Sequence, residues 1–73
     1  MPKLPVLSAA QVCKILRRHG FLVVRQTGSH IIMRRQLPNH GITIPIPNHT
    51  EIAKGTLKSI IEQSELPRSE FIK

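Results

Sequence analysis

The chain of 73 residues contains no aspartate, no tryptophan and no tyrosine, and it has only two phenylalanines. Its four acidic side chains are therefore all glutamates. Nuclease sites that use two metal ions need several clustered carboxylates, so metal-assisted phosphodiester chemistry is disfavoured here. The scarcity of aromatic side chains likewise separates the chain from modules that stack nucleic-acid bases on aromatic platforms.

Cysteine and long apolar runs are also scarce. Cys13 is the single cysteine, which excludes an internal disulfide and a cysteine metal cage, and its place in a helical apolar pattern predicts a packed thiol. No run approaches the ~20 apolar residues of a membrane span. No apolar segment typical of a signal peptide follows Lys3. We therefore expect a cytoplasmic protein without membrane association.

Positive charge is the property that the chain has in excess. Eleven lysines and arginines against four glutamates give a formal net charge of +7 at pH 7. Such a balance favours a polyanionic partner, of which nucleic acid is the commonest. A chain of this length has room for one modest core. We expect one domain over residues 1–73, monomeric when free, with an extended lead-in at 1–7 and a C-terminal tail at 67–73.

Two segments carry the apolar spacing of helices. In residues 8–19 apolar side chains recur at i, i+3, i+4 and i+7, Ser8 and Gln11 match a capping box, and Gly20 is placed to end the helix. Residues 54–63 form the second predicted helix. The face of the first helix opposite its apolar stripe carries Lys14, Arg17 and Arg18. This face suits either phosphate contacts or a solvated helix end that complements the dipole.

Three segments between the helices read as strands, over residues 21–25, 29–34 and 42–47. In the third, isoleucines alternate with Thr43, Pro45 and Pro47, so one face is apolar and the prolines require an edge position. The order helix, three strands, helix predicts an α+β fold. We expect a three-stranded antiparallel sheet with two helices on one face.

The predicted hairpin between the first two strands gathers reactive side chains. Residues 26–28 read as its tight turn, in which Gly28 offers a position where a positive φ costs little. Arg25 ends the outgoing strand, and Ser29 and His30 begin the returning one. The hairpin therefore brings a cation, a hydroxyl and an imidazole to one end of the sheet.

Such a set suits metal-free cleavage of RNA. That reaction needs a base for the 2′-hydroxyl proton, a cation for the phosphorane charge, and an acid for the leaving oxygen. His30 is the candidate base and His49 a candidate acid. The candidates for charge stabilisation and RNA contact are Arg25, Arg34, Lys54 and Lys58. Since DNA lacks the 2′-hydroxyl, this mechanism would confine cleavage to RNA.

The same residues also allow interpretations without catalysis. His30 can be a strand histidine that merely packs or meets solvent. The four histidines show no short metal-ligand spacing, although three of them could converge on zinc in space. Ser29 lacks an aspartate to complete a Ser-His-Asp set. His19 suits a helix-end charge and His40 a turn.

A larger ordered pattern covers nearly the whole chain, from about Ser8 to Leu66. It comprises Gly20-Phe21, then Arg25-Gln26-x-Gly28-Ser29-His30, then Pro45 to His49, then Glu51-Ile52-x-x-Gly55-Thr56-Leu57-x-x-Ile60-Ile61-x-Gln63. This set resembles the HicA family, the small mRNA interferase toxins of HicA–HicB toxin–antitoxin modules. Gly-Ser-His alone is a weak signal, but it is strong when the downstream Gly-Thr-Leu block follows at this spacing.

The resemblance implies a double-stranded-RNA-binding-domain-like fold and ribosome-independent cleavage of mRNA without metal or other cofactor. It also implies a HicB-like antitoxin that covers the active site, and it maps the catalytic histidine of the family onto His30. A competing hypothesis is a non-catalytic basic RNA-binding module on the same fold. A third is a degenerate toxin that is kept only as a binding partner for the antitoxin.

Overall fold

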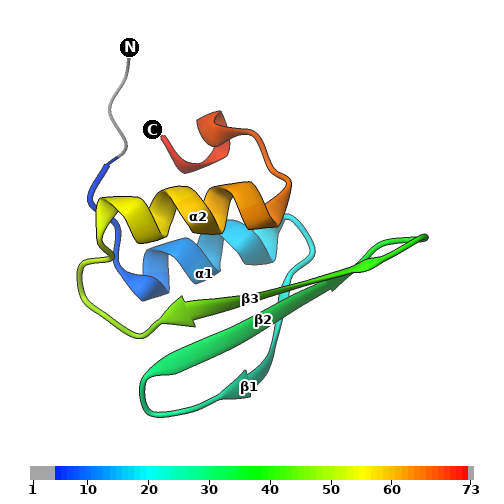
Figure 1. The fold of residues 1–73 in the computed structure, drawn as a ribbon, viewed down its shortest axis with the longest axis horizontal. Coiled ribbons are helices and arrows are strands. Elements are labelled where there is room, and N and C mark those ends of the chain that lie inside the picture. The colour runs from blue at the N-terminus through cyan, green and yellow to red at the C-terminus, as the bar shows by residue number, and fades with distance from the viewer. Residues whose placement is uncertain (1–4, 73) are drawn as a thin grey trace.

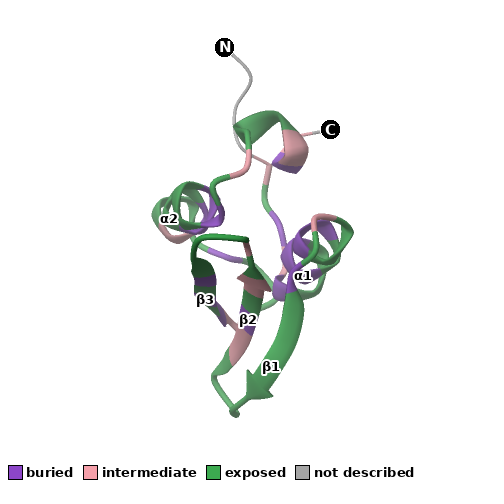
Figure 2. Cartoon of the chain, turned by 90° about the vertical axis from the view of Figure 1, so that its right-hand side faces the viewer, coloured by how far each residue is buried: buried purple, intermediate pink, exposed green. Residues whose placement is uncertain are grey.

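The structure, a computed structural model, describes residues 5–72. Along the chain its elements are α1 (Ala9–Arg18), β1 (Leu22–Gln26), β2 (His30–Gln36), β3 (Gly41–Pro47), α2 (Lys54–Ser64) and the 3-10 helix η1 (Arg68–Phe71). Figures 1 and 2 show that α1 and α2 lie on the same side of the sheet. The predicted α-β-β-β-α fold with a three-stranded antiparallel sheet is confirmed.

Helix α1 begins and ends at the predicted signals. The Gln11 N–H donates to Ser8 Oγ at 3.2 Å, and the Ser8 N–H donates to Gln11 Oε1 at 2.9 Å, which completes the capping box. His19 ends the helix, and Gly20 follows with φ of +92°. A residue with a side chain would be strained at this φ. Glycine at position 20 therefore allows the chain to reverse here.

The sheet order is β1-β2-β3, which places β2 in the centre. β2 and β3 pair in register from His30 opposite Pro47 to Gln36 opposite Gly41. The three isoleucines of β3 are buried, whereas Pro45 between them is exposed. β3 is thus an edge strand with its apolar face toward the helices, as the alternation of isoleucine and proline predicted.

The core joins segments from both ends of the described chain. Phe21 and Phe71 are both fully buried, although 50 positions separate them. Leu7 is also in the core, and its carbonyl accepts a hydrogen bond of 2.8 Å from the Ile52 N–H. The segment predicted as a C-terminal tail forms η1, which docks Phe71 into this core. Residues 1–4 of the predicted lead-in, and residue 73, lie outside the described residues.

All residues of strand β1 are exposed, although its apolar sequence is typical of a buried strand. Leu22 retains 67% of its accessible surface, Val23 38% and Val24 57%. Both helices pack against β3 at the opposite edge. Figure 2 shows the contrast, with β1 drawn as exposed along its length. In the described part of the chain, neither helix is long and apolar enough to cross a membrane.

Candidate functional site

Thr27 closes the turn between β1 and β2. Its N–H donates to the His30 carbonyl at 2.8 Å, and its hydroxyl accepts from the His30 N–H at 3.0 Å. The same hydroxyl donates to the His30 carbonyl at 3.2 Å. Gln26 remains in β1, so the turn lies one residue later than predicted. No role is predicted for Thr27 from its sequence position, although a hydroxyl residue at the start of a turn is a recognised signal.

Gly28 has a different role from the one its type suggested. The expected positive φ is wrong, since Gly20 is the one glycine of residues 5–72 with positive φ. A Cβ built on Gly28 would meet no atom within 4 Å. Neither backbone conformation nor internal packing therefore requires glycine here, and the residue leaves open surface beside His30.

The imidazole of His30 is exposed at the end of the central strand. Ser29 Oγ lies 3.1 Å from His30 Nδ1. Among the residues that the structure describes, none forms a hydrogen bond with Nε2 of this ring. Side chains along β2 alternate between the two faces of the sheet, and Met33 is buried on the face toward the helices. His30, three positions before Met33, therefore lies on the face that the helices leave open. One ring nitrogen is thus held by the protein while the other faces outward.

The loop after β3 runs beside this hairpin end. The Asn48 N–H donates to the Ser29 carbonyl at 2.9 Å, and the His49 carbonyl accepts from the Ala9 N–H at 2.9 Å. Figure 1 shows the β1–β2 turn and the β3–α2 loop at the same end of the sheet. The backbone of the exposed His49 is therefore one residue from the bond that joins the loop to the turn.

A β-bulge decides where Arg25 lies. Val23 pairs with Met33, but Arg25 pairs with Ile32, so Val24 is an extra residue in β1. Opposed residues share a sheet face, and Ile32 alternates with Met33, so Arg25 lies on the open face with His30. If Val24 instead paired with Ile32 in a regular ladder, Arg25 would lie opposite Ile31 and face the helices. The bulge therefore places a guanidinium and the imidazole on one face.

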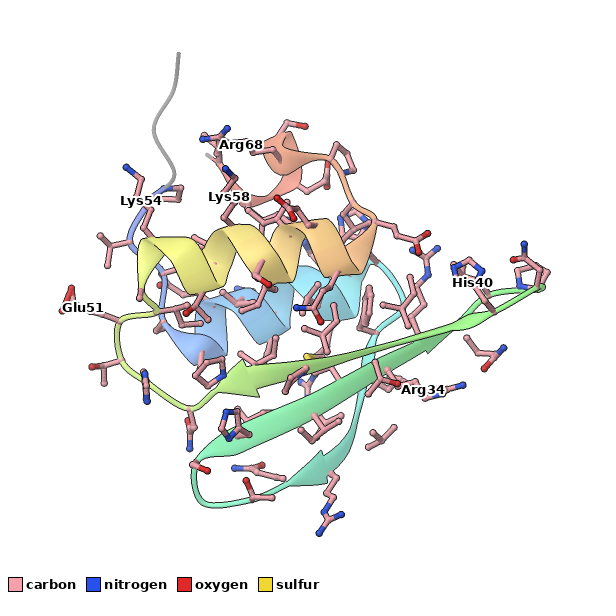
Figure 3. All side chains as sticks on the ribbon, in the orientation of Figure 1. Arg34, His40, Glu51, Lys54, Lys58 and Arg68 are labelled. Atoms are coloured by element: carbon pink, nitrogen blue, oxygen red, sulfur yellow. The ribbon has the colours of Figure 1, made fainter. Side chains whose placement is uncertain are left out.

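The remaining predicted cations lie elsewhere. Arg34 donates to Thr43 Oγ1 at 3.0 Å and to Gln36 Oε1 at 2.7 Å, four strand positions from His30. Figure 3 shows Arg34 toward the His40 end of the sheet, and it shows Lys54 and Lys58 on the side of α2 away from the sheet. The structure brings together Arg25, Gly28, Ser29 and His30, and it does not bring Arg34, Lys54 or Lys58 to them.

Two other histidines connect distant segments through carboxylates. His19 Nε2 donates to Glu70 Oε1 at 2.7 Å and so joins the end of α1 to η1. His40 Nε2 donates to Glu65 Oε2 at 3.1 Å and joins the β2–β3 turn to the end of α2. Within residues 5–72, no three His, Cys, Asp or Glu side chains gather closely enough to hold a metal ion.

The thiol of Cys13 is buried under α1, as its helical spacing predicted. Burial raises the pKa of Cys13 above its ordinary value, and the positive charge of Arg17 offsets part of this effect. The thiol therefore stays protonated at neutral pH, which does not favour a nucleophilic role.

A basic α+β domain of charge +7, with an exposed histidine and arginine on the open face of its sheet, is suited to a polyanionic partner. Residues 9–66 match the family model described as HicA toxin of bacterial toxin-antitoxin. Because this match covers most of the chain, the protein belongs to the HicA family and is a toxin of a toxin–antitoxin module. Comparison with curated proteins finds no match.

Proposed function

We propose that this toxin is a metal-independent endoribonuclease that cleaves mRNA, with His30 as the catalytic base. The observation that carries the proposal is the presentation of His30, whose Nδ1 is held by Ser29 while Nε2 faces outward from an exposed sheet end. Membership of the HicA family supports it, because toxins of this family are generally of the ribonuclease type. Its site of action would be the cytoplasm, where mRNA is translated.

The reaction begins with proton transfer from the ribose 2′-hydroxyl to His30 Nε2. In the tautomer that can accept this proton, Nδ1 carries hydrogen and donates to Ser29 Oγ. The 2′-oxygen then forms a bond to the adjacent phosphorus, and the bond from phosphorus to the 5′-oxygen breaks. The products are a 2′,3′-cyclic phosphate and a free 5′-hydroxyl, so no water molecule is consumed in this step.

Two further groups complete the proposed chemistry. Arg25, on the same sheet face as His30, neutralises the negative charge that develops on the phosphorane oxygens. A protonated group must supply the leaving 5′-oxygen with hydrogen, and His49 is the candidate because its loop is bonded to the hairpin end. Gly28 leaves room for the RNA backbone to approach the turn. Lys54 and Lys58 could contact RNA only beyond the immediate site.

The proposed partners follow from this placement. The substrate is mRNA, and the antitoxin would be a HicB-like protein that blocks access to the exposed His30. The free toxin would act as a monomer.

The decisive experiment is incubation of the purified chain with a long mRNA in excess EDTA, alongside His30→Ala and His40→Ala. His40 is a matched control, because it is an exposed histidine at the other end of the sheet. We expect the wild type and His40→Ala to produce fragments ending in cyclic or 3′-phosphate. His30→Ala should lose at least about 100-fold in rate, the usual contribution of a general base.

RNA binding and thermal melting of the same proteins separate the competing functions. His30→Ala should keep its melting temperature and still shift RNA on a gel. If neither wild type nor variant cuts while both bind RNA, the chain is a binding module. If the melting temperature of His30→Ala collapses, the imidazole is structural.

A further inference from the structure

A groove of about 650 Å³ lies between α1 and β1, on the helix side of the sheet. Its apolar lining comes from Ala10 and Cys13 on α1, Val23 on β1 and Ile31 on β2. It forms because both helices pack toward β3 and leave the helix-facing side of β1 uncovered. The groove is separate from the ribonuclease site proposed above, since His30 lies on the opposite face of the sheet.

The floor of this groove ends at an unpaired strand edge. β1 has β2 as its neighbour on one side, and no other described strand lies on its outer side. The two sheet edges differ in composition, because β3 carries Pro45 and Pro47 whereas β1 carries no proline. Prolines protect an edge from further pairing, so β1 is the edge that can accept another strand.

Exposed aliphatic side chains mark the same strand. Among the described residues, the exposed large hydrophobic side chains are Val6 and three successive residues of β1, Leu22, Val23 and Val24. Val23, opposite Met33, lies on the groove side, whereas Leu22, opposite Arg34, lies on the open face. The exposure of Val23 costs free energy in the isolated chain and would be relieved by an apolar partner in the groove. A phosphate backbone offers no such surface, so RNA is the less suitable occupant.

The rim of the groove is basic. Lys14, Arg17 and Arg18 line it from α1, and no carboxylate contributes to its lining. Charge complementarity therefore calls for an acidic occupant. A second copy of this chain fits poorly, since each copy carries a net charge of +7.

We propose that the α1–β1 groove binds an acidic polypeptide segment in extended conformation, which adds a fourth strand beside β1. Its main chain pairs with the open edge, its apolar side chains contact Val23 and Ile31, and its carboxylates meet the basic rim. This inference does not depend on the proposed cleavage of RNA. Its occupant is a polypeptide defined by acidic and apolar side chains in alternation.

The probe for this site is a short synthetic peptide in which glutamate and valine alternate, titrated into the ¹⁵N-labelled full chain. We expect its amide shifts to cluster on β1 and on the α1 residues that line the groove. Charge reversal at the rim, in Arg17→Glu, should weaken the affinity roughly tenfold. Lys14→Glu serves as a second rim variant, in case Arg17→Glu disturbs the end of α1.

Arg68→Glu is the charge-matched control, because Arg68 is an exposed arginine on η1, outside the groove. It should change the affinity by less than about twofold, as expected for a distant charge. Equal weakening by Arg17→Glu and Arg68→Glu would show a general charge effect and overturn the proposal. Shifts on the open sheet face, or no binding by the peptide, would overturn it as well.

Titration with a short RNA tests whether nucleic acid, rather than a polypeptide, occupies the groove. If RNA shifts the groove amides and displaces the peptide from them, the surface is a nucleic-acid site and the proposal fails. His30→Ala should bind the peptide like the wild type. Loss of RNA cleavage in that variant with unchanged peptide binding would therefore separate the two proposals.

Discussion

Ser29 precedes His30 in the chain, and its hydroxyl lies 3.1 Å from Nδ1 of that imidazole. Both residues are exposed, so the contact contributes little to stability. Its consequence is orientation, since the contact holds the ring position. In the tautomer with hydrogen on Nδ1, the serine oxygen accepts from that nitrogen and Nε2 can take a proton. Ser29 is thus a positioning residue in the proposed mechanism.

The prediction for Ser29→Ala is a cleavage rate about five- to tenfold below that of the wild type, because one neutral hydrogen bond contributes ~1 kcal/mol. The melting temperature should stay unchanged. Single-turnover cleavage of a short RNA measures the effect, with Ser69→Ala on η1 as the control. A loss as large as that of His30→Ala would instead mean that Ser29 acts directly on the substrate.

Cys13 predicts a dependence of stability on alkaline pH. Because burial raises its pKa in the folded state, the folded chain holds the thiol proton more tightly than the unfolded chain. The unfolded state therefore ionises first, and the free energy of unfolding falls as pH rises above about 8.5. Cys13→Ala should lack this contribution, so the difference between the two proteins should narrow with rising pH. Urea unfolding between about pH 7.5 and 10 measures it, and a constant difference would contradict the prediction.

At the scale of elements, strand β1 contributes to both proposed sites. Its bulge at Val24 sets the face on which Arg25 lies, and its outer edge and the exposed Val23 belong to the proposed docking surface. Bulges bend a strand and re-aim side chains, and they are frequent beside active sites. Because Val24 stays unpaired, the guanidinium lies on the sheet face where the proposed mechanism places the phosphate.

Arg25→Ala tests the role of the guanidinium, and deletion of Val24 tests the role of the bulge. The deletion should restore regular alternation with Arg25 still opposite Ile32, on the open face, while the sheet still forms. We expect cleavage by Arg25→Ala to fall roughly 100-fold, for removal of one charge-stabilising group, and cleavage by the deletion variant to stay close to that of the wild type. Circular dichroism and the melting temperature show whether the fold persists. Full activity in a folded Arg25→Ala variant would show that Arg25 is not needed.

At the scale of the whole molecule, stability depends on segments that meet from distant positions in the sequence. Phe21, just after α1, and Phe71, in η1, are both buried in the single core. The His19–Glu70 hydrogen bond of 2.7 Å joins the same two regions. Because a chain of this size has only one modest core, the loss of any large buried side chain removes a large share of its stability.

Phe71→Ala should therefore lower the free energy of unfolding by ~3–5 kcal/mol, the usual cost of deleting a buried phenylalanine side chain. Urea denaturation measures it, with the half-buried Ile72→Ala as the neighbouring control. A cost below about 1 kcal/mol would mean that η1 is only loosely attached to the rest of the domain.

Local signals predicted most of the fold. The capping box at Ser8, the stop at Gly20 and the alternating isoleucines of β3 each depend on a few neighbouring residues, and the structure has all of them where expected. The position of His30 at the start of β2 followed from the same kind of signal. Errors were confined to the ends of strands and to the turn, where Thr27 rather than Gly28 shapes the backbone.

Other features depend on contacts that no short stretch of sequence encodes. The apolar run of β1 is typical of a covered strand, yet the packing of both helices toward β3 leaves it exposed. The face of Arg25 depends on the pairing register between β1 and β2, which cross-strand contacts set. The distance of Lys54 and Lys58 from His30 depends on the layer in which α2 lies. Periodicity and capping act within a few residues, whereas register and layer packing arise only when the whole chain is folded.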